Sequence, residues 1–449
     1  MTFSLMPRSN VTGKPYYRQR TVRIAAAISW MVLSLMGCWP RTANSPTPPE
    51  FTSTRDLPSP KERVDGVLPS AEGGRSKTGP SAGRILGIQV LLFSAHTQDE
   101  LDGEMRRIAD TGANTVIVRV FHNKGDRFYS FAAPRAQAGV YFTTTHAPVV
   151  DDVLGPIIGA ARRSNLSVWA WMTTRYAAWG DEADGLFAYD FRKKTILPVF
   201  GRDLFDDERV DDLVLLYKDL AAYDIDGILF QDDLVLRHNE GMGEGAQELY
   251  GGPIRPDSLY IAPYPSRDGT KYYAKGYTDE FWKWSRFKAR RLAAVAGAII
   301  DGVHEIRPDM PFAVNLSYES VILPEDALAW LSQDFAEFKE QGVDYFFIMA
   351  YHRQIMREKG LADLGAALRV LGEISSRAEL IVGEPERVGI KLQIADWDTG
   401  APIGSVELMR AASSLSGIGR ISLVFVPFSG DAPLVEVGEI FRTARGKEK

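Results

Sequence analysis

The stretch "DGILFQDDLVL" (Asp226–Leu236) runs a short apolar segment straight into two adjacent carboxylates, Asp232 and Asp233. A short apolar run bounded by polar residues is typical of a buried strand. Two neighbouring acids repel each other and lose hydration on burial, so a fold keeps such a pair where it is well solvated, well paired or used in chemistry. The pattern around this stretch decides both the fold and the meaning of the acids.

Seven other apolar runs resemble this one, and amphipathic segments with apolar residues at helical spacing lie between them. Eight such alternations over about 360 residues predict an α/β fold, a (β/α)8 TIM-like barrel spanning residues 84–445. A doubly wound open sheet is the alternative, but no Gly-rich phosphate turn follows any of the runs. The eight predicted strands lie within residues 84–94, 115–123, 166–174, 226–233, 311–318, 343–351, 388–397 and 420–428.

In a barrel of this class, catalytic residues lie at the carboxyl ends of the strands and in the loops that follow. Polar and aromatic residues collect there, and the long segment from Arg237 to about Thr278 follows the fourth strand. We predict Asp232 and Asp233 as catalytic residues, although Asp also commonly caps a loop. The predicted substrate contacts are Arg119, His146, Trp171, Asn315, Tyr318, Tyr351, Asp396 and Trp397.

Paired carboxylates at an aromatic-rich mouth suit glycoside hydrolysis, which needs one acid for the leaving oxygen and one group to stabilise the developing cation. Successive side chains on a strand face opposite ways, so adjacent acids fit poorly on either side of one bond. Two alternatives remain open. Either Asp232 or Asp233 works with a more distant acid such as Asp396, Asp398 or Glu319, or the pair assists an N-acetyl group of the substrate acting as the nucleophile.

Composition excludes several other classes of function. The net charge of −6 gives no basic footprint for nucleic acid. The chain has one cysteine, which rules out Cys-based zinc sites and thiol catalysis, and its histidines lack paired metal-ligand spacing. We therefore expect no metal site and no cofactor.

The N-terminal segment has the features of an export signal. Basic residues precede an apolar run from Ile24 to Met36, and the following Gly37-Cys38 completes a sequence similar to a bacterial lipobox. We predict a lipoprotein signal peptide over residues 1–38, lipidation at Cys38 and a Pro/Ser-rich flexible linker over residues 39–83. An uncleaved anchor, or a cleaved signal with an incidental cysteine, is the alternative. The predicted location is the bacterial cell envelope, on the periplasmic side or the cell surface.

Several motifs give the chain a family resemblance. They are "ADTGANTVIVRVFHNKGD", "AGVYFTTTHAPVVDD", "VWAWM", "DGILFQDDLVL", "FAVNLS", "FIMAY" and "IKLQIADWDTGAPIGSVELM", in this order. The set resembles the C-terminal hydrolase domain of PgaB, a periplasmic protein of poly-β-1,6-N-acetylglucosamine export. The family's strand-four acids fall on Asp232 and Asp233, Gln231 stands where His is usual, and the strand-seven Asp-Trp pair falls on Asp396 and Trp397.

The resemblance implies a barrel that binds and cleaves partially de-N-acetylated poly-β-1,6-N-acetylglucosamine, with export machinery as a possible partner. Deacetylation is not expected, because residues 39–83 carry no His-x-x-x-His motif and leave no room for a deacetylase domain. A non-catalytic polysaccharide-binding protein of exopolysaccharide export is the alternative function. A barrel hydrolase for peptidoglycan or an α-glucan is a third possibility.

Overall fold

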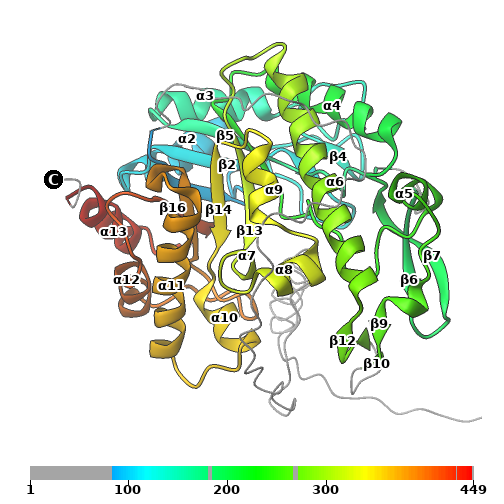
Figure 1. Ribbon diagram of the computed structural model, residues 1–449. Coiled ribbons are helices and arrows are strands. Elements are labelled where there is room, and N and C mark those ends of the chain that lie inside the picture. Colours follow the sequence, from blue (N-terminus) through cyan, green and yellow to red (C-terminus); the bar gives the residue numbers. More distant parts are fainter. Residues whose placement is uncertain (1–82, 180–184, 266–271, 431, 447–449) are drawn as a thin grey trace, which may run out of the picture.

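Eight parallel strands close into a barrel in the computed structural model, which describes residues 83–179, 185–265, 272–430 and 432–446 (Figure 1). Each strand hydrogen-bonds to its neighbours in chain order, and β1 pairs with β16 to close the ring. The predicted barrel is therefore confirmed, and the open sheet is excluded. The strands are β1 (Leu86–Val90), β2 (Thr115–Arg119), β5 (Ser167–Met172), β8 (Gly227–Phe230), β13 (Phe312–Ser317), β14 (Tyr345–Met349), β15 (Val388–Gln393) and β16 (Ser422–Phe428).

Helices surround the barrel, and several begin at a residue whose side chain accepts a hydrogen bond from the first turn. Thr97, Asp206, Thr278 and Asp363 cap helices in this way. Their apolar faces lie against the strands, which explains the helical spacing seen in the sequence. The main helices are α2 (Gln98–Asp110), α3 (Leu154–Arg163), α4 (Asp207–Ala221), α6 (Asp279–His304), α9 (Phe335–Glu340), α11 (Leu364–Val382), α12 (Ser405–Ser413) and α13 (Leu434–Gly446).

Two excursions leave the barrel at the carboxyl ends of β5 and β8 and lie together on the right of Figure 1. The first is the antiparallel hairpin of β6 (Gly185–Asp190) and β7 (Thr195–Arg202). The second, within the long segment after β8, contacts the hairpin through the rings of Phe191 and Tyr260, 4.8 Å apart. Its elements are α5 (Glu244–Tyr250), η1 (Pro256–Ser258), β9 (Tyr260–Ile261), β10 (Tyr264–Pro265), β11 (Tyr272–Tyr273) and β12 (Gly276–Tyr277).

Short elements follow the carboxyl ends of β2, β13 and β14, and one precedes β15. They are β3 (Phe121–His122), β4 (Gly139–Val140), α7 (Glu319–Ile322), α8 (Pro324–Leu331), α10 (His352–Glu358) and η2 (Pro385–Arg387). All of them except η2 follow the carboxyl end of a barrel strand, so they lie at the end where the candidate site is expected.

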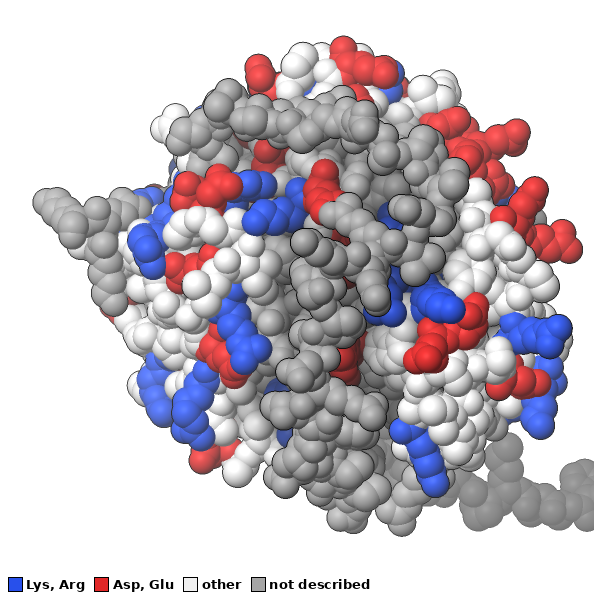
Figure 2. Space-filling model, in the orientation of Figure 1, with Lys and Arg blue, Asp and Glu red and all other residues white. Residues whose placement is uncertain are grey.

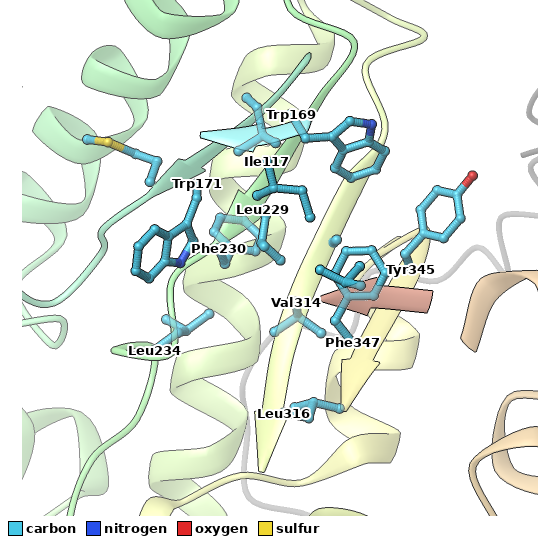
Figure 3. Close-up of a cluster of buried hydrophobic side chains, with 14 of the residues drawn as sticks. Ile117, Trp169, Trp171, Leu229, Phe230, Leu234, Val314, Leu316, Tyr345 and Phe347 are labelled. Atoms are coloured by element: carbon cyan, nitrogen blue, oxygen red, sulfur yellow. The ribbon is translucent and has the colours of Figure 1, made fainter. Parts of the chain in front are cut away.

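Large rings fill the barrel interior. The ring of Trp169 lies 5.4 Å from that of Tyr345 and 6.4 Å from that of Phe347, and Figure 3 shows the three side by side. Their bulk requires glycine on the adjacent strands, because a Cβ at Gly227 would lie 2.4 Å from Trp169 and one at Gly389 would lie 1.7 Å from Phe347. This part of the barrel interior is therefore a packed core.

The described surface carries both signs of charge. On the face drawn in Figure 2, Lys and Arg are interspersed with Asp and Glu. Within the described ranges, no helix is long and apolar enough to cross a membrane. The predicted signal peptide and linker, with Cys38, lie outside the described residues.

Candidate active site

Asp232 lies directly beyond β8 and is 9 % exposed. Burial raises the pKa of its carboxyl to about 6, and the neighbouring charge of Asp233 adds to the rise, while Lys391 partly opposes it. A carboxyl with this pKa keeps a proton for part of the time near neutral pH. Asp232 can therefore act as a proton donor, which an ordinary exposed aspartate cannot do efficiently.

Lys391 supplies the cation that faces Asp232. It is 2 % exposed, and its Nζ donates to Asn315 Oδ1 at 3.0 Å. Asn315 lies on β13 and Lys391 on β15, so the hydrogen bond bridges β14 between them. Burial lowers the pKa of the Lys391 ammonium to about 8, and Asp232 opposes this fall.

Lys391 was absent from the residues predicted to form the site. The sequence does contain a signal for Lys391. It is a lone cation in the apolar run "VGIKLQI", and it shares one face of the strand with Gly389 and Gln393. A charged residue in a run otherwise fit for burial indicates a polar site at that point of the barrel.

Tyr351 and Trp397 form an aromatic pair beside these charges. Their ring centroids are 5.2 Å apart in an edge-to-face arrangement. Burial and then the charge of Asp232 raise the pKa of the Tyr351 hydroxyl well above its usual range, which places the hydroxyl near that carboxyl. Within the described part of the chain, the buried indole N–H of Trp397 has no hydrogen-bond acceptor.

Asp233 has different surroundings from Asp232, although the two are adjacent in the sequence. It is fully buried, and both its oxygens accept hydrogen bonds from the loop that follows β5. Oδ2 accepts from Thr173 Oγ1 at 2.6 Å and from Tyr176 N at 2.7 Å, while Oδ1 accepts from Thr174 Oγ1 at 2.8 Å; Thr174 N lies 3.0 Å from both oxygens. Asp233 therefore ties the end of β8 to the loop after β5.

Asp396 is held by a separate network. Its Oδ2 accepts from Arg353 Nη1 at 3.0 Å, and its Oδ1 accepts from the backbone N–H groups of Asp398 and Thr399, each at 3.0 Å. Burial opposes ionisation of Asp396, but these bonds outweigh it and lower its pKa. Arg353 also forms two hydrogen bonds to Glu407, at 2.6 and 2.8 Å, so the network positions the loop that carries the neighbouring Trp397.

The two remaining candidate acids differ in environment. Asp398 is exposed and pairs with Arg357 at 2.9 Å. Burial, followed by the charge of Glu358, raises the pKa of Glu319 to about 7, and Glu319 accepts a hydrogen bond from Ser317 Oγ. Glu319 follows β13, the strand next to β8, so it lies at the same end of the barrel as Asp232.

The other side chains predicted to contact substrate have partners other than Asp232. Arg119 pairs with Asp126 at 2.8 Å, and Tyr318 donates to Glu358 at 3.0 Å. Trp171, opposite Arg119 in the register of β2 and β5, has a buried indole N–H with no acceptor among the described residues. His146 lies half-buried in the loop before α3, where its backbone N–H donates to Thr144 Oγ1 at 3.0 Å.

In the described part of the chain, no three His, Cys, Asp or Glu side chains are arranged to hold a metal ion. The arrangement instead offers a proton donor, Asp232, beside a cation and an aromatic pair. These are the components of acid-assisted cleavage of a glycosidic bond.

Comparison with known proteins gives one family match. A family model described as "Hypothetical glycosyl hydrolase family 13" matches residues 94–426, which include the barrel strands from β2 to β15 and most of β16. No curated protein matches the sequence.

Solved structures share the fold. The PgaB (BpsB) glycoside hydrolase domain from Bordetella bronchiseptica superimposes with a TM-score of 0.58 at 20% identity, covering 81% of this chain and 97% of that domain. A β-galactosidase from Rahnella sp. R3 has a TM-score of 0.51 at 12% identity, and the match covers 82% of this chain and 57% of the β-galactosidase chain. A β-galactosidase from Halorubrum lacusprofundi has a TM-score of 0.51 at 12% identity, and the match covers 80% of this chain and 58% of the β-galactosidase chain. At these identities the likeness is one of fold.

Proposed function

We propose that this protein cleaves internal bonds of partially de-N-acetylated poly-β-1,6-N-acetylglucosamine. The protein belongs to the glycosyl hydrolase family whose model it matches. The observation that carries the proposal is Asp232, a buried carboxyl whose pKa of about 6 suits a general acid, placed beside Lys391 and the Tyr351–Trp397 pair. The motif resemblance to the PgaB hydrolase domain supports the choice of polymer.

Asp232 acts as the acid in this proposal. Its proton goes to the glycosidic oxygen as the bond from that oxygen to the anomeric carbon breaks. One water then supplies the hydroxyl to that carbon, and the remaining proton of the water returns to the Asp232 carboxylate. Asp233 cannot attack the same carbon, because its oxygens are occupied by Thr173, Thr174 and Tyr176. The group that stabilises the cation therefore comes from outside the pair, either as the substrate's N-acetyl oxygen or as another acid such as Glu319.

Free glucosamine units carry an ammonium group, and carboxylates with aromatic faces bind such cations. The described mouth supplies both kinds of group, with Tyr351 and Trp397 beside Asp232. This combination supports an amino-sugar polymer over a neutral α-glucan.

The test is release of reducing ends from poly-β-1,6-glucosamine of graded acetylation by purified protein that starts at residue 39. Release with fragments of intermediate length supports internal cleavage, and dependence on acetylation at the cleaved sugar supports participation of the N-acetyl oxygen. Polymer binding without any release would favour the polysaccharide-binding alternative. Release only from peptidoglycan or an α-glucan would exclude the proposed substrate.

We also propose that the protein is a lipoprotein of the cell envelope, anchored through Cys38. This rests on the signal sequence alone, because the segment lies outside the described residues. Partitioning of the full chain into detergent, measured against Cys38→Ser, tests the anchor, and unchanged partitioning would contradict it.

Lys391 gives a prediction for the pH dependence of cleavage. A general acid is active while protonated, so activity should fall as the pH rises through the pKa of Asp232, about 6. Lys391→Met removes the cation that lowers this pKa, and we expect the alkaline limb of the kcat/KM profile to move to higher pH by roughly one unit. Lys193→Met, which removes an exposed cation on the β6–β7 turn, is the control. If the alkaline limb of the kcat/KM profile stays at the same pH in Lys391→Met, Asp232 is not the titrating acid.

A further inference from the structure

An aromatic pair lies beside the candidate site on the first excursion from the barrel. The ring of Phe200, on β7, stacks on that of Tyr176, with centroids 5.6 Å apart and planes inclined by 25°. Phe200 is 49 % exposed, the most exposed aromatic side chain in the described part of the chain. An exposed ring stacked on a fixed partner presents one apolar face to solvent.

Two hydrogen bonds hold Tyr176 in place. Its backbone N–H donates to Asp233 Oδ2 at 2.7 Å, and its hydroxyl accepts from Arg175 Nη2 at 2.7 Å. Arg175 is itself fully buried and paired with Glu240, on the segment after β8. Asp233, the residue next to Asp232, therefore holds the backbone of Tyr176, and Arg175 holds its ring.

The hairpin is fastened to this loop beside Phe200. Arg202 N donates to Arg175 O at 2.7 Å. Gly201, between Phe200 and Arg202, has φ of +134°, and a Cβ there would lie 2.9 Å from Leu186 Cδ2 and 3.2 Å from Arg175 Cγ. Only glycine allows this close approach, which brings Phe200 onto Tyr176.

We propose that Tyr176 and Phe200 form a sugar-binding subsite, in which a unit of the polymer away from the cleaved bond packs its C–H face on the exposed side of Phe200. Pyranose C–H groups are attracted to the negative face of an aromatic ring. The subsite lies at the same end of the barrel as the acid, because Tyr176 is in the loop after β5, the strand next to β8, and is hydrogen-bonded to Asp233, the residue next to Asp232. This inference rests on the proposed polysaccharide substrate, and it adds a second site at which the protein contacts the polymer.

The test compares Phe200→Ala with Phe200→Trp, which keeps an aromatic face, and with Leu380→Ala. Leu380 is an 80 % exposed apolar residue near the end of α11, which leads to the amino end of β15, so it controls for loss of exposed apolar surface. Hydrolysis is measured on oligosaccharides of increasing length and on polymer. Binding of polymer is measured separately in the Asp232→Asn background.

We expect Phe200→Ala to raise KM for long chains and Kd for polymer by about 5- to 10-fold, with kcat and the hydrolysis of short oligosaccharides unchanged. Phe200→Trp should remain close to wild type. The inference is overturned if Phe200→Ala matches Leu380→Ala at every chain length, or if wild type binds no polysaccharide. Weaker polymer binding by Phe200→Ala without hydrolysis by any variant would support the subsite and refute the hydrolase.

Discussion

Asp232→Asn should abolish most cleavage of the polymer while the protein stays folded and keeps binding it. Loss of a general acid costs about 10²- to 10⁴-fold in rate, and asparagine matches the size of aspartate but has no acidic proton to give. The measurement is kcat/KM for reducing-end release, with polymer affinity and thermal unfolding recorded on the same samples.

Stability at pH 7 should not fall in this variant. The folded-state pKa of Asp232, about 6, lies above the ordinary aspartate value of 3.8, so the stability this carboxyl contributes is complete below about pH 3.8 and is lost as the pH rises through 6. At pH 7 the ionised carboxylate is buried at a cost, and a neutral amide avoids that cost.

A substrate with an activated leaving group separates the possible roles of Asp232. An aryl glycoside whose leaving group needs no proton should be cleaved by Asp232→Asn much more nearly at the wild-type rate than the polymer is. Equal losses on both substrates would mean that Asp232 stabilises or attacks the anomeric carbon. Full activity on the polymer would remove it from the chemistry altogether.

Asp233→Asn should instead destabilise the fold. Both oxygens of Asp233 accept hydrogen bonds, so an amide group at either position would face N–H or O–H donors from Thr173, Thr174 and Tyr176. An unsatisfied buried group costs about 1–3 kcal/mol, and here at least two groups are affected, so we expect a loss of roughly 2–5 kcal/mol in the free energy of unfolding. Denaturant unfolding measures it.

Activity should fall together with stability in Asp233→Asn, because the loop after β5 would lose its anchor. Asp398→Asn is the matched control, since Asp398 is an exposed acid at another strand end and pairs only across the surface with Arg357. It should change unfolding by less than about 1 kcal/mol. An Asp233→Asn protein as stable as wild type but inactive would return Asp233 to the chemistry, as a catalytic partner of Asp232.

The barrel could be predicted because its signal is local and repeated. Each apolar run, such as "DGILFQDD" or "VDYFFIMAY", contains a strand buried on both faces, and each amphipathic segment buries one side of a helix. The strand ends can be placed for the same reason, so the sequence alone predicts that Asp232 and Asp396 lie at the barrel mouth. The elements inside the segment after β8 were not predicted, because strands of two residues leave no periodicity.

The contacts of the site could not be predicted in the same way. Lys391 reaches Asn315 past an intervening strand, 76 residues away in the chain. Phe200 meets Tyr176 only because Gly201 allows the hairpin to approach Arg175. No spacing rule relates residues that a barrel brings together from different strands.

The sequence by itself determined that this protein is a (β/α)8 barrel with an acidic, aromatic mouth, because burial of apolar strands and helix faces depends on patterns within each segment. Only the tertiary structure distinguished Asp232 from Asp233. These residues are identical and adjacent, but the donors of Thr173, Thr174 and Tyr176 surround one carboxylate, while burial raises the pKa of the other and Lys391 only partly opposes that rise. A carboxyl's proton affinity and its freedom to react depend on neighbours in space, and those neighbours come from other strands.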